Sequence, residues 1–273
     1  MSTSDGLREG VRAIRRGKVW LVGAGPGDPE LLTIKAARVI AGADVLAYDE
    51  LVSDEILALA PASAERIPVG RRAGGCRHHE ARIHPAVIER ALEGHRVVRL
   101  KGGDPFIFGR GGEEAEELAA ARVPFEIVPG ISAALGAAAS THIPLTHRDV
   151  AASVTFATAH LATDAEGPAF VASLPPRGTL VLYMGLGGLE RTFAALITHG
   201  RPPETPAAAI SRATLPDQRV VKGTLATLPA RVREAALPAP TLLIIGEVVA
   251  RAVESPAMTA MLDAAVAQAV ASR

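Results

Sequence analysis

Short apolar segments recur along this chain, and each is followed by a glycine-containing loop and a stretch with helical periodicity. The first is Lys18–Gly23, before a helical pattern over residues 31–41, and the second is residues 97–100, before a helical pattern over residues 113–121. Strands that alternate with helices in this way form parallel sheets covered by helices on both faces. The pattern therefore predicts an α/β fold.

The same alternation continues to the C-terminal end and predicts a second sheet. Further apolar segments indicate strands at residues 125–128, 154–157, 179–184, 207–210 and 242–245. A chain of 273 residues suits two medium-sized domains. We expect an N-terminal extension (residues 1–16), an N-terminal α/β domain (17–129), a C-terminal α/β domain (130–251) and a C-terminal helical tail (252–273).

Charge and composition exclude several classes of protein. Equal numbers of basic and acidic residues, 29 of each, give no net charge, which argues against a nucleic-acid binder that neutralises many phosphates. No apolar run approaches the roughly 18–20 residues of a membrane span. The single cysteine, Cys76, cannot form an internal disulfide, and residues 1–16 lack the apolar core of a signal peptide. We expect a cytoplasmic protein that binds neither nucleic acid nor membrane.

The first loop, residues 23–29, reads G-A-G-P-G-D-P. Its glycines are closer together than in the G-x-G-x-x-G turn that binds dinucleotides, and prolines interrupt the start of the helix. Glycine lets the backbone approach a ligand closely, and Pro26 stiffens the loop. A ligand-binding loop, a plain tight turn and a nicotinamide site remain alternatives at this point.

The second loop, residues 101–114, reads K-G-G-D-P-F-I-F-G-R-G-G-E-E, and six of these residues are Gly or Pro. It follows a buried strand, and ligands of open α/β sheets collect beyond the carboxyl ends of the strands. The loop offers a carboxylate (Asp104), apolar side chains (Ile107, Phe108) and a cation (Arg110). An ordinary connection does not need so many special backbone positions, so we expect a binding site here.

These loops belong to a longer set of motifs that resembles the tetrapyrrole methylase family. The matching segments cover about residues 18–250 and are G-A-G-P-G-D-P-E-L-L-T (23–33), Y-D-E-L-V-S (48–53), V-G-R-R-A-G (69–74), R-L-K-G-G-D-P-F-I-F-G-R-G-G-E-E (99–114), V-P-G-I-S-A (128–133), I-P-L-T-H-R-D (143–149), S-V-T-F (153–156), Y-M-G (183–185), Q-R-V-V-K-G-T-L (218–225) and G-E-V-V (246–249). The long glycine-rich loop together with Y-D-E-L-V-S is the most specific part of the match.

The resemblance implies a class III methyltransferase with two α/β domains of mainly parallel sheets, an active site in the cleft between them, and a homodimeric assembly. It also implies S-adenosyl-L-methionine as the methyl donor, S-adenosyl-L-homocysteine as its product, and no metal. The cofactor-binding positions that it implies are Pro26, Gly102, Gly103, Asp104, Ile107, Ser132, Ala133, Met184 and Ala213.

The acceptor that the resemblance implies is uroporphyrinogen III, methylated at C2 and then at C7 to give precorrin-2 through precorrin-1. Precorrin-2 leads to sirohaem, cobalamin or haem d1, and the sequence does not select among them. Asp49 matches the family's proposed general base, and Arg110 is a second catalytic candidate. Arginines suit an acceptor rich in carboxylates, so the substrate-binding candidates are Arg71, Arg72, Arg110, Arg148 and His160.

Two departures from the family pattern affect these roles. Arg71 stands where the family often has a lysine assigned as a proton donor, and an arginine is effectively always protonated. We keep Arg71 as a catalytic and substrate-binding candidate, with carboxylate binding as the role that survives. The segment C-R-H-H-E-A-R-I-H (76–84) contains one cysteine and three histidines, but its spacing fits no standard zinc site.

Three other functions remain as alternatives to early-step methylation. The first is a sister methylase that acts on a later corrin precursor, which the Y-D-E-L-V-S segment disfavours. The second is a nicotinamide-dependent oxidoreductase built on the first loop. The third is a tetrapyrrole-binding protein without catalytic activity.

Overall fold

The computed structural model describes residues 17–69, 83–159 and 166–253, with side chains from residue 170 onward in the last range. The chain divides into two compact units, residues 1–132 and 133–273. The expected N-terminal extension and residues 254–273 of the expected tail lie outside the described residues. None of the helices in the described ranges combines the length and the apolar character that crossing a membrane requires.

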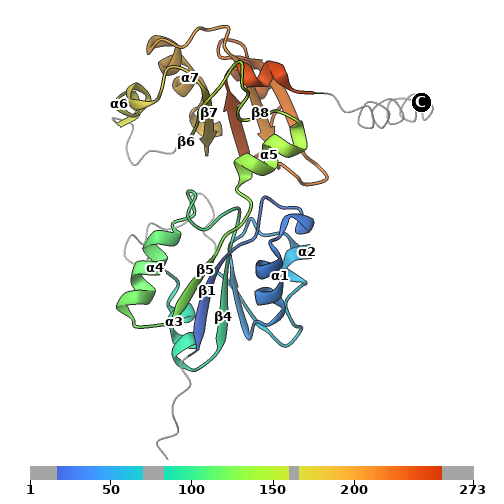
Figure 1. The fold of residues 1–273 in the computed structure, drawn as a ribbon, viewed down its shortest axis with the longest axis vertical. Coiled ribbons are helices and arrows are strands. Elements are labelled where there is room, and N and C mark those ends of the chain that lie inside the picture. Colours follow the sequence, from blue (N-terminus) through green and yellow to red (C-terminus); the bar gives the residue numbers. More distant parts are fainter. Residues whose placement is uncertain (1–16, 70–82, 160–165, 254–273) are drawn as a thin grey trace, which may run out of the picture. The chain divides into compact units, whose positions relative to one another are not determined.

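The first unit is built on a five-stranded sheet whose pairings are all parallel within the described residues (Figure 1). The strand order is β3-β2-β4-β1-β5. The strands are β1 (Lys18–Gly23), β2 (Val45–Tyr48), β3 (Glu65–Pro68), β4 (Arg96–Lys101) and β5 (Phe125–Val128). Since all of them run in one direction, their carboxyl ends lie along one edge, where the two glycine-rich loops begin.

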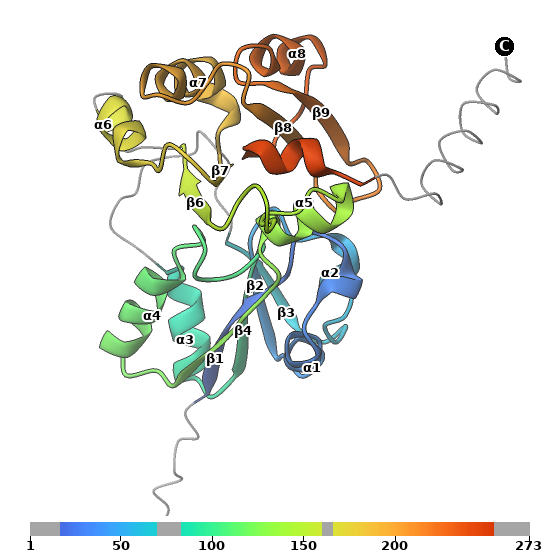
Figure 2. The same cartoon turned by 45° about the horizontal axis from the view of Figure 1, so that its top comes forward.

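Helices cover both faces of this sheet (Figures 1 and 2). Helices α1 (Ile34–Ala41) and α2 (Asp54–Leu57) lie on one face, and α3 (Pro85–Leu92) and α4 (Gly111–Ala120) lie on the other. Consecutive side chains of a strand point to opposite faces, so Leu21 packs in the α3–α4 core and Val22 in the α1–α2 core. Burial on both faces explains why β1 is apolar from Val19 to Val22.

The helical pattern predicted over residues 31–41 begins later than expected. A short 3-10 turn, η1 (Pro29–Leu31), comes first, and α1 starts at Ile34. Thr33 has an extended backbone, and its Oγ1 accepts a hydrogen bond from the Ala36 amide at 3.1 Å. This N-cap satisfies one of the free amides of the first turn and fixes the start of α1.

The second unit contains another five-stranded sheet, in the order β6-β7-β10-β8-β9. Helices α6, α7 and α8 pack against one core of this sheet, and α5 and η3 pack against the other. The elements are α5 (Ala133–Thr141), β6 (Val154–Thr158), α6 (Glu166–Ser173), β7 (Thr179–Tyr183), η2 (Leu186–Gly188), α7 (Leu189–Thr198), β8 (Pro206–Ser211), β9 (Arg219–Thr224), α8 (Leu228–Glu234), β10 (Thr241–Ile245) and η3 (Glu247–Arg251).

The prediction of an α/β chain with mainly parallel sheets is confirmed, since five of the eight strand pairings in the described residues are parallel. The second sheet by itself departs from it. Only β6 and β7 pair in parallel there, and the other three pairings are antiparallel. The connection from β8 to β9 is shorter than the dozen or so residues that a parallel crossover needs, so these two strands form a hairpin.

Candidate active site

Three loops meet at the carboxyl edge of the first sheet, after β1, β4 and β5. Gly25 and Gly103 exchange two backbone hydrogen bonds, of 2.7 and 3.1 Å. A Cβ atom on Gly23 would lie 2.6 Å from the Gly103 carbonyl oxygen, and one on Gly130 would lie 2.3 Å from the same oxygen. The loops touch through their backbones because these positions carry no side chain. We call Gly23, Gly103 and Gly130 the glycine junction.

Asp104 ties two of these loops together. Its Oδ1 accepts a hydrogen bond from the Phe106 amide at 2.8 Å, and its Oδ2 accepts one from the Gly130 amide at 3.0 Å. The sequence suggested that Asp104 binds the cofactor directly. The carboxylate also has a structural task, which is to hold the second loop in shape against the glycine junction.

Gly102 differs from its neighbours because packing does not require a glycine there. Among the described residues, a Cβ atom at this position would meet only the Leu51 Cβ, at an ordinary contact distance of 3.7 Å. The space beside this backbone is open. The exposed apolar side chains of Phe106 and Phe108 lie on the same loop, and that of Leu51 lies on the loop after β2. Open backbone flanked by apolar groups suits a ligand with polar and apolar parts. The half-buried Pro26 and Ile107 belong to the same loops.

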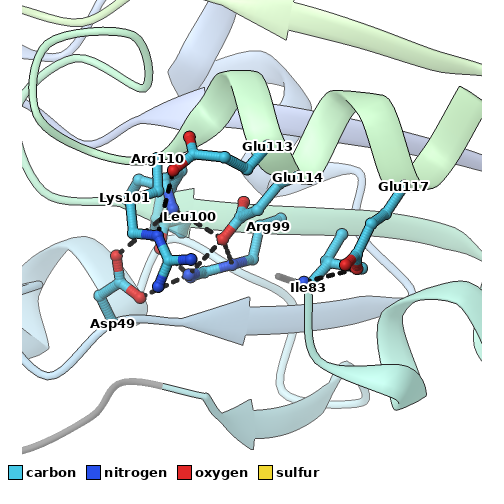
Figure 3. Close-up of polar contacts among 9 residues, drawn as sticks. All are labelled: Asp49, Ile83, Arg99, Leu100, Lys101, Arg110, Glu113, Glu114 and Glu117. Carbon is cyan, nitrogen blue, oxygen red and sulfur yellow. Dashed lines mark hydrogen bonds and ion pairs between the residues drawn. The ribbon is translucent and has the colours of Figure 1, made fainter. Parts of the chain in front are cut away.

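Asp49 follows β2 at the same edge and belongs to a group of four charged side chains (Figure 3). Its Oδ1 lies 2.6 Å from Arg99 Nη2, and its Oδ2 lies 3.9 Å from Lys101 Nζ. Both cations also contact Glu114 Oε1, at 3.0 Å and 2.8 Å. We call Asp49, Arg99, Lys101 and Glu114 the ion cluster.

The ion cluster is buried except at Asp49. The side chains of Arg99, Lys101 and Glu114 are 6%, 3% and 4% exposed, whereas that of Asp49 is 29% exposed. Burial lowers the pKa of the Lys101 ammonium group, and the charge of Arg99 lowers it further, while Glu114 and Asp49 raise it. Asp49 is therefore the member of the cluster that can meet a ligand, and the other three lie behind it.

The sequence did not single out Arg99, Lys101 and Glu114. Their signal is present in β4, because this strand is buried after its exposed first residue, Arg96, and yet carries charged residues at positions 99 and 101. Alternate residues of a strand share a face, so Arg99 and Lys101 point together toward the first turn of α4. Charged residues are almost never fully buried without partners, and two of them on one face predict a buried acid nearby.

Arg110 lies at the N-terminal end of α4 with an exposed side chain, and its Nε donates to Glu113 Oε1 at 3.3 Å. Its backbone is left-handed, with φ 58°, and so is that of Phe108, with φ 54°. Left-handed conformations of residues other than glycine are strained and collect at functional sites. The strain falls within the second loop, where the sequence places the ligand.

In the second unit, the predicted residues Met184 and Ala213 lie just after β7 and β8, which run in the same direction because both are antiparallel to β10. Met184 directly follows β7, is 54% exposed and has a φ of 55°. Ala213 lies between Arg212 and Thr214, whose φ values are 51° and 69°. These left-handed positions mark the same edge of the second sheet.

Side-chain contacts hold this edge in place. The Tyr183 hydroxyl accepts a hydrogen bond from the Ala134 amide at 3.1 Å, in the first turn of α5, which begins at Ala133. Gln218 Oε1 accepts from the Thr214 amide and from Ser140 Oγ, both at 2.7 Å. The predicted cofactor position Ala213 therefore sits in a loop fastened to α5.

Of the remaining predicted residues, two lie in the described part of the chain and three do not. Ser132 is buried at the end of the first unit, and Arg148 is exposed in a turn that the Val150 amide closes on the His147 carbonyl at 3.1 Å. Arg71, Arg72 and His160 lie outside the described residues, and so does the stretch from Cys76 to residue 82. Among the described residues, no group of three or more His, Cys, Asp or Glu is arranged to hold a metal ion.

Comparison with known proteins places this chain in a family. The family model described as Tetrapyrrole (Corrin/Porphyrin) Methylases matches residues 18–229. Siroheme synthase of Pseudomonas fluorescens (strain Pf0-1) is 53% identical over 241 residues, which cover 88% of this chain and 52% of that protein. Siroheme synthase of Azotobacter vinelandii is 54% identical over 233 residues, or 85% of this chain and 50% of that protein. The chain thus spans about half the length of these curated relatives.

Solved structures of similar proteins match this chain along most of their length. Uroporphyrin-III C-methyl transferase from Thermus thermophilus, complexed with S-adenyl homocysteine, has a TM-score of 0.73 and 38% identity, covering 88% of this chain and 96% of that one. Cobalt precorrin-4 methyltransferase, a cobalamin biosynthetic enzyme, has a TM-score of 0.74 and 27% identity, covering 85% and 95%. On these matches, and on the loops described above, the chain belongs to the tetrapyrrole methylase family.

Proposed function

We propose that this chain transfers methyl groups from S-adenosyl-L-methionine to C2 and C7 of uroporphyrinogen III, giving precorrin-2 through precorrin-1. The observation that carries this proposal is the 38% identity, over 88% of the chain, to a uroporphyrin-III C-methyl transferase complexed with S-adenyl homocysteine. The lower identity of 27% to cobalt precorrin-4 methyltransferase favours the early step over a later corrin precursor.

The described residues fit the methyl donor, which supplies an electrophilic methyl group on a sulfonium centre when it is bound. The open backbone at Gly102 offers polar groups to the donor, and Asp104 keeps that loop in shape. Gly103 belongs to the proposed set as the residue that holds this loop against Gly25 through two backbone hydrogen bonds. Pro26 and Ile107 supply apolar surface in the first unit. Ser132, Ala133, Met184 and Ala213 complete the proposed cofactor-binding set.

The acceptor is held by cations and deprotonated by Asp49. Arg110 and Arg148 are exposed and suit the peripheral carboxylates of a tetrapyrrole. Arg71, Arg72 and His160 are proposed acceptor contacts on the basis of sequence. The exposed part of Asp49 takes the proton that the methylated ring must lose, and Arg110 assists catalysis by fixing the acceptor. Alignment of the acceptor carbon with the methyl group supplies much of the rate.

The experiment that tests this function feeds the purified chain uroporphyrinogen III and S-adenosyl-L-methionine and weighs the tetrapyrrole product. The proposal predicts two added methyl groups and one S-adenosyl-L-homocysteine per methyl group. A parallel reaction with cobalt precorrin-4 is expected to give no methylation. No methyl transfer to uroporphyrinogen III, or transfer to cobalt precorrin-4 alone, contradicts the proposal.

We further propose that the protein is a cytoplasmic homodimer. The dimer follows from the family resemblance, and the single cysteine of the sequence agrees with a reducing compartment such as the cytoplasm. Light scattering coupled to size-exclusion chromatography tests the dimer, and a monomeric mass at micromolar concentration argues against it.

A further inference from the structure

The carboxylate of Glu114 uses its two oxygens very unequally. Oε1 accepts three hydrogen bonds, from Arg99 Nε at 3.2 Å, Arg99 Nη2 at 3.0 Å and Lys101 Nζ at 2.8 Å. Oε2 is buried and has no hydrogen-bond partner among the described residues. A buried carboxylate oxygen without a hydrogen-bond partner is unfavourable. The position of Glu114 is therefore explained by what Oε1 does for Arg99 and Lys101, and not by the hydrogen bonding of Glu114 itself.

Glu114 fixes the orientation of the Arg99 guanidinium group. The Nε and Nη2 edge faces Glu114, and Nη1 donates to the Leu100 carbonyl oxygen at 3.0 Å. Nη2 is shared, since it also lies 2.6 Å from Asp49 Oδ1. Every nitrogen of the guanidinium group is engaged, and Nη2 presents a single contact to Asp49.

Glu114 also sets the position of Lys101. The ammonium nitrogen lies 2.8 Å from Glu114 Oε1 and 3.9 Å from Asp49 Oδ2, so it is bonded to Glu114 and beyond hydrogen-bond distance of Asp49 (Figure 3). One oxygen of Asp49 is therefore held by Arg99, and the other is not held by Lys101.

We propose that Glu114 is a positioning residue for Asp49: by binding Lys101 and one edge of Arg99, it keeps Lys101 away from Asp49 Oδ2 and leaves that oxygen for the tetrapyrrole acceptor. This inference rests on the proposed function, in which Asp49 takes a proton from the methylated ring. Without the negative charge of Glu114, two buried cations face Asp49 alone, and Lys101 closes onto Oδ2.

Stability alone does not explain the ion cluster. Taking charged groups out of water is unfavourable, and apolar side chains of similar volume often replace a buried ion pair with no loss of stability. In the cluster, three charged side chains are almost fully buried and the fourth, Asp49, opens to solvent. Three buried charged side chains that hold one partly exposed carboxylate are the arrangement expected when the buried groups position the proposed base, Asp49.

The first test replaces Glu114 by Gln, which keeps the shape of the side chain and removes its charge. Glu117→Gln is the matched control, because Glu117 lies on the same helix and its Oε2 accepts from the Ile83 amide at 2.8 Å, away from the cluster. We expect E114Q to lower kcat by about 10- to 100-fold, less than the roughly 10²- to 10⁴-fold that a general base contributes, because Asp49 itself is retained. We expect little change in KM and in S-adenosyl-L-homocysteine affinity. E117Q is expected to retain wild-type kcat.

The second test asks whether removing the excess cation restores activity. In the double variant Lys101→Met/Glu114→Gln, only Arg99 and Asp49 remain, their charges balance, and nothing closes onto Oδ2. We expect kcat to return to within about tenfold of wild type, a strongly non-additive result for neighbouring residues. A purely structural role for Glu114 predicts further loss instead. Should E114Q fail to fold, the double variant decides the question alone.

The third readout does not depend on turnover. A crystal structure of E114Q is expected to place Lys101 Nζ at about 3 Å or less from Asp49 Oδ2, the range of a charge-assisted hydrogen bond. An unchanged separation, or E114Q as active as E117Q, overturns the inference. If the wild-type protein itself adds no methyl group to uroporphyrinogen III, the proposed function fails, and the separation in E114Q still decides what Glu114 does to Lys101.

Discussion

At the scale of single residues, Asp49 and Glu114 are far apart in the sequence, yet both contact Nη2 of Arg99, at 2.6 and 3.0 Å. Asp49 was predicted from its motif, because Y-D-E-L-V-S is readable in the sequence. Its partners were not predicted, because a contact between a loop after β2 and the first turn of α4 depends on the tertiary fold. A local sequence motif identifies an unusual residue, but the tertiary fold determines which distant residues it contacts.

Replacing Asp49 by Asn is expected to lower kcat by about 10²- to 10⁴-fold, the contribution of a general base. The amide keeps the size of the side chain and loses the basic oxygen. Steady-state methylation assays measure the loss, and calorimetric titration with S-adenosyl-L-homocysteine checks that the cofactor site is intact. Wild-type turnover in D49N means that another group removes the proton.

A substitution at Gly102 tests the proposed cofactor site. Replacing it by Val is expected to leave the thermal unfolding midpoint within a few degrees of wild type, since Leu51 Cβ at 3.7 Å is the contact that an added Cβ makes among the described residues. The new side chain fills the open space, so S-adenosyl-L-homocysteine affinity is expected to fall at least tenfold. Unchanged affinity in a folded G102V protein places the cofactor elsewhere.

At the scale of elements, the first unit follows the sequence closely, and the departures have physical reasons. Strands β1 and β4 were predicted because burial on both faces makes their central residues mostly apolar. Strands β2 and β3 were not among the predicted strands: each has four residues, and most of the β3 residues Glu65–Pro68 are exposed. Strand β9 was missed for the same reason, since half of Arg219–Thr224 is exposed on an edge strand. Short or exposed strands carry a weak apolar signal.

The glycine junction predicts a difference between two glycines of the first unit. Gly130→Ala is expected to disturb the loops after β1 and β4, because its Cβ would lie 2.3 Å from the Gly103 carbonyl oxygen. Gly112→Ala is the control, since nothing among the described residues lies within 4 Å of its Cβ. We expect G130A to lower both the unfolding midpoint and cofactor affinity, and G112A to preserve both. If the two variants have the same unfolding midpoint and the same cofactor affinity, close packing at the glycine junction does not hold these loops in place.

Ion pairs between elements predict how stability depends on pH. Glu126 of β5 contacts Lys18 of β1 at 2.5 Å and Lys35 of α1, and hydrogen bonds from these lysines lower the pKa of Glu126 from 4.5 to about 2. A lowered carboxyl pKa stabilises the folded state above the unfolded value of 4.5, and the stabilisation is lost as pH falls toward about 2. Because these groups are partly exposed, each pair contributes at most about 1 kcal/mol.

Thermal unfolding of Glu126→Gln measures this contribution. Between pH 4.5 and pH 2, the midpoint of the wild-type protein is expected to fall more steeply than that of E126Q, and high salt is expected to reduce the difference. If the unfolding midpoints of the two proteins change in parallel over this pH range, Glu126 does not contribute to the pH dependence of stability.

At the scale of the whole molecule, the sequence predicts two α/β units and the structure contains two, residues 1–132 and 133–273. The second sheet was predicted less well than the first, because apolar segments do not report the direction of a strand. The short connection between β8 and β9 indicates that these two strands are antiparallel. The sequence could not be interpreted in this way because the apolar signal of β9 was too weak to predict that strand. Among the described residues, Asp49 and Gly102 of the first unit, and Met184 and Ala213 of the second, lie beyond the carboxyl ends of strands that run in the same direction within their unit.

We propose that the loops at the carboxyl edge of the first sheet hold the methyl donor. A crystal structure of the protein with S-adenosyl-L-homocysteine bound locates the donor. We expect the ligand against the open backbone of Gly102, with Gly103 still bonded to Gly25 and Asp104 still bonded to the Gly130 amide. A ligand bound away from these loops means that the methyl donor binds elsewhere.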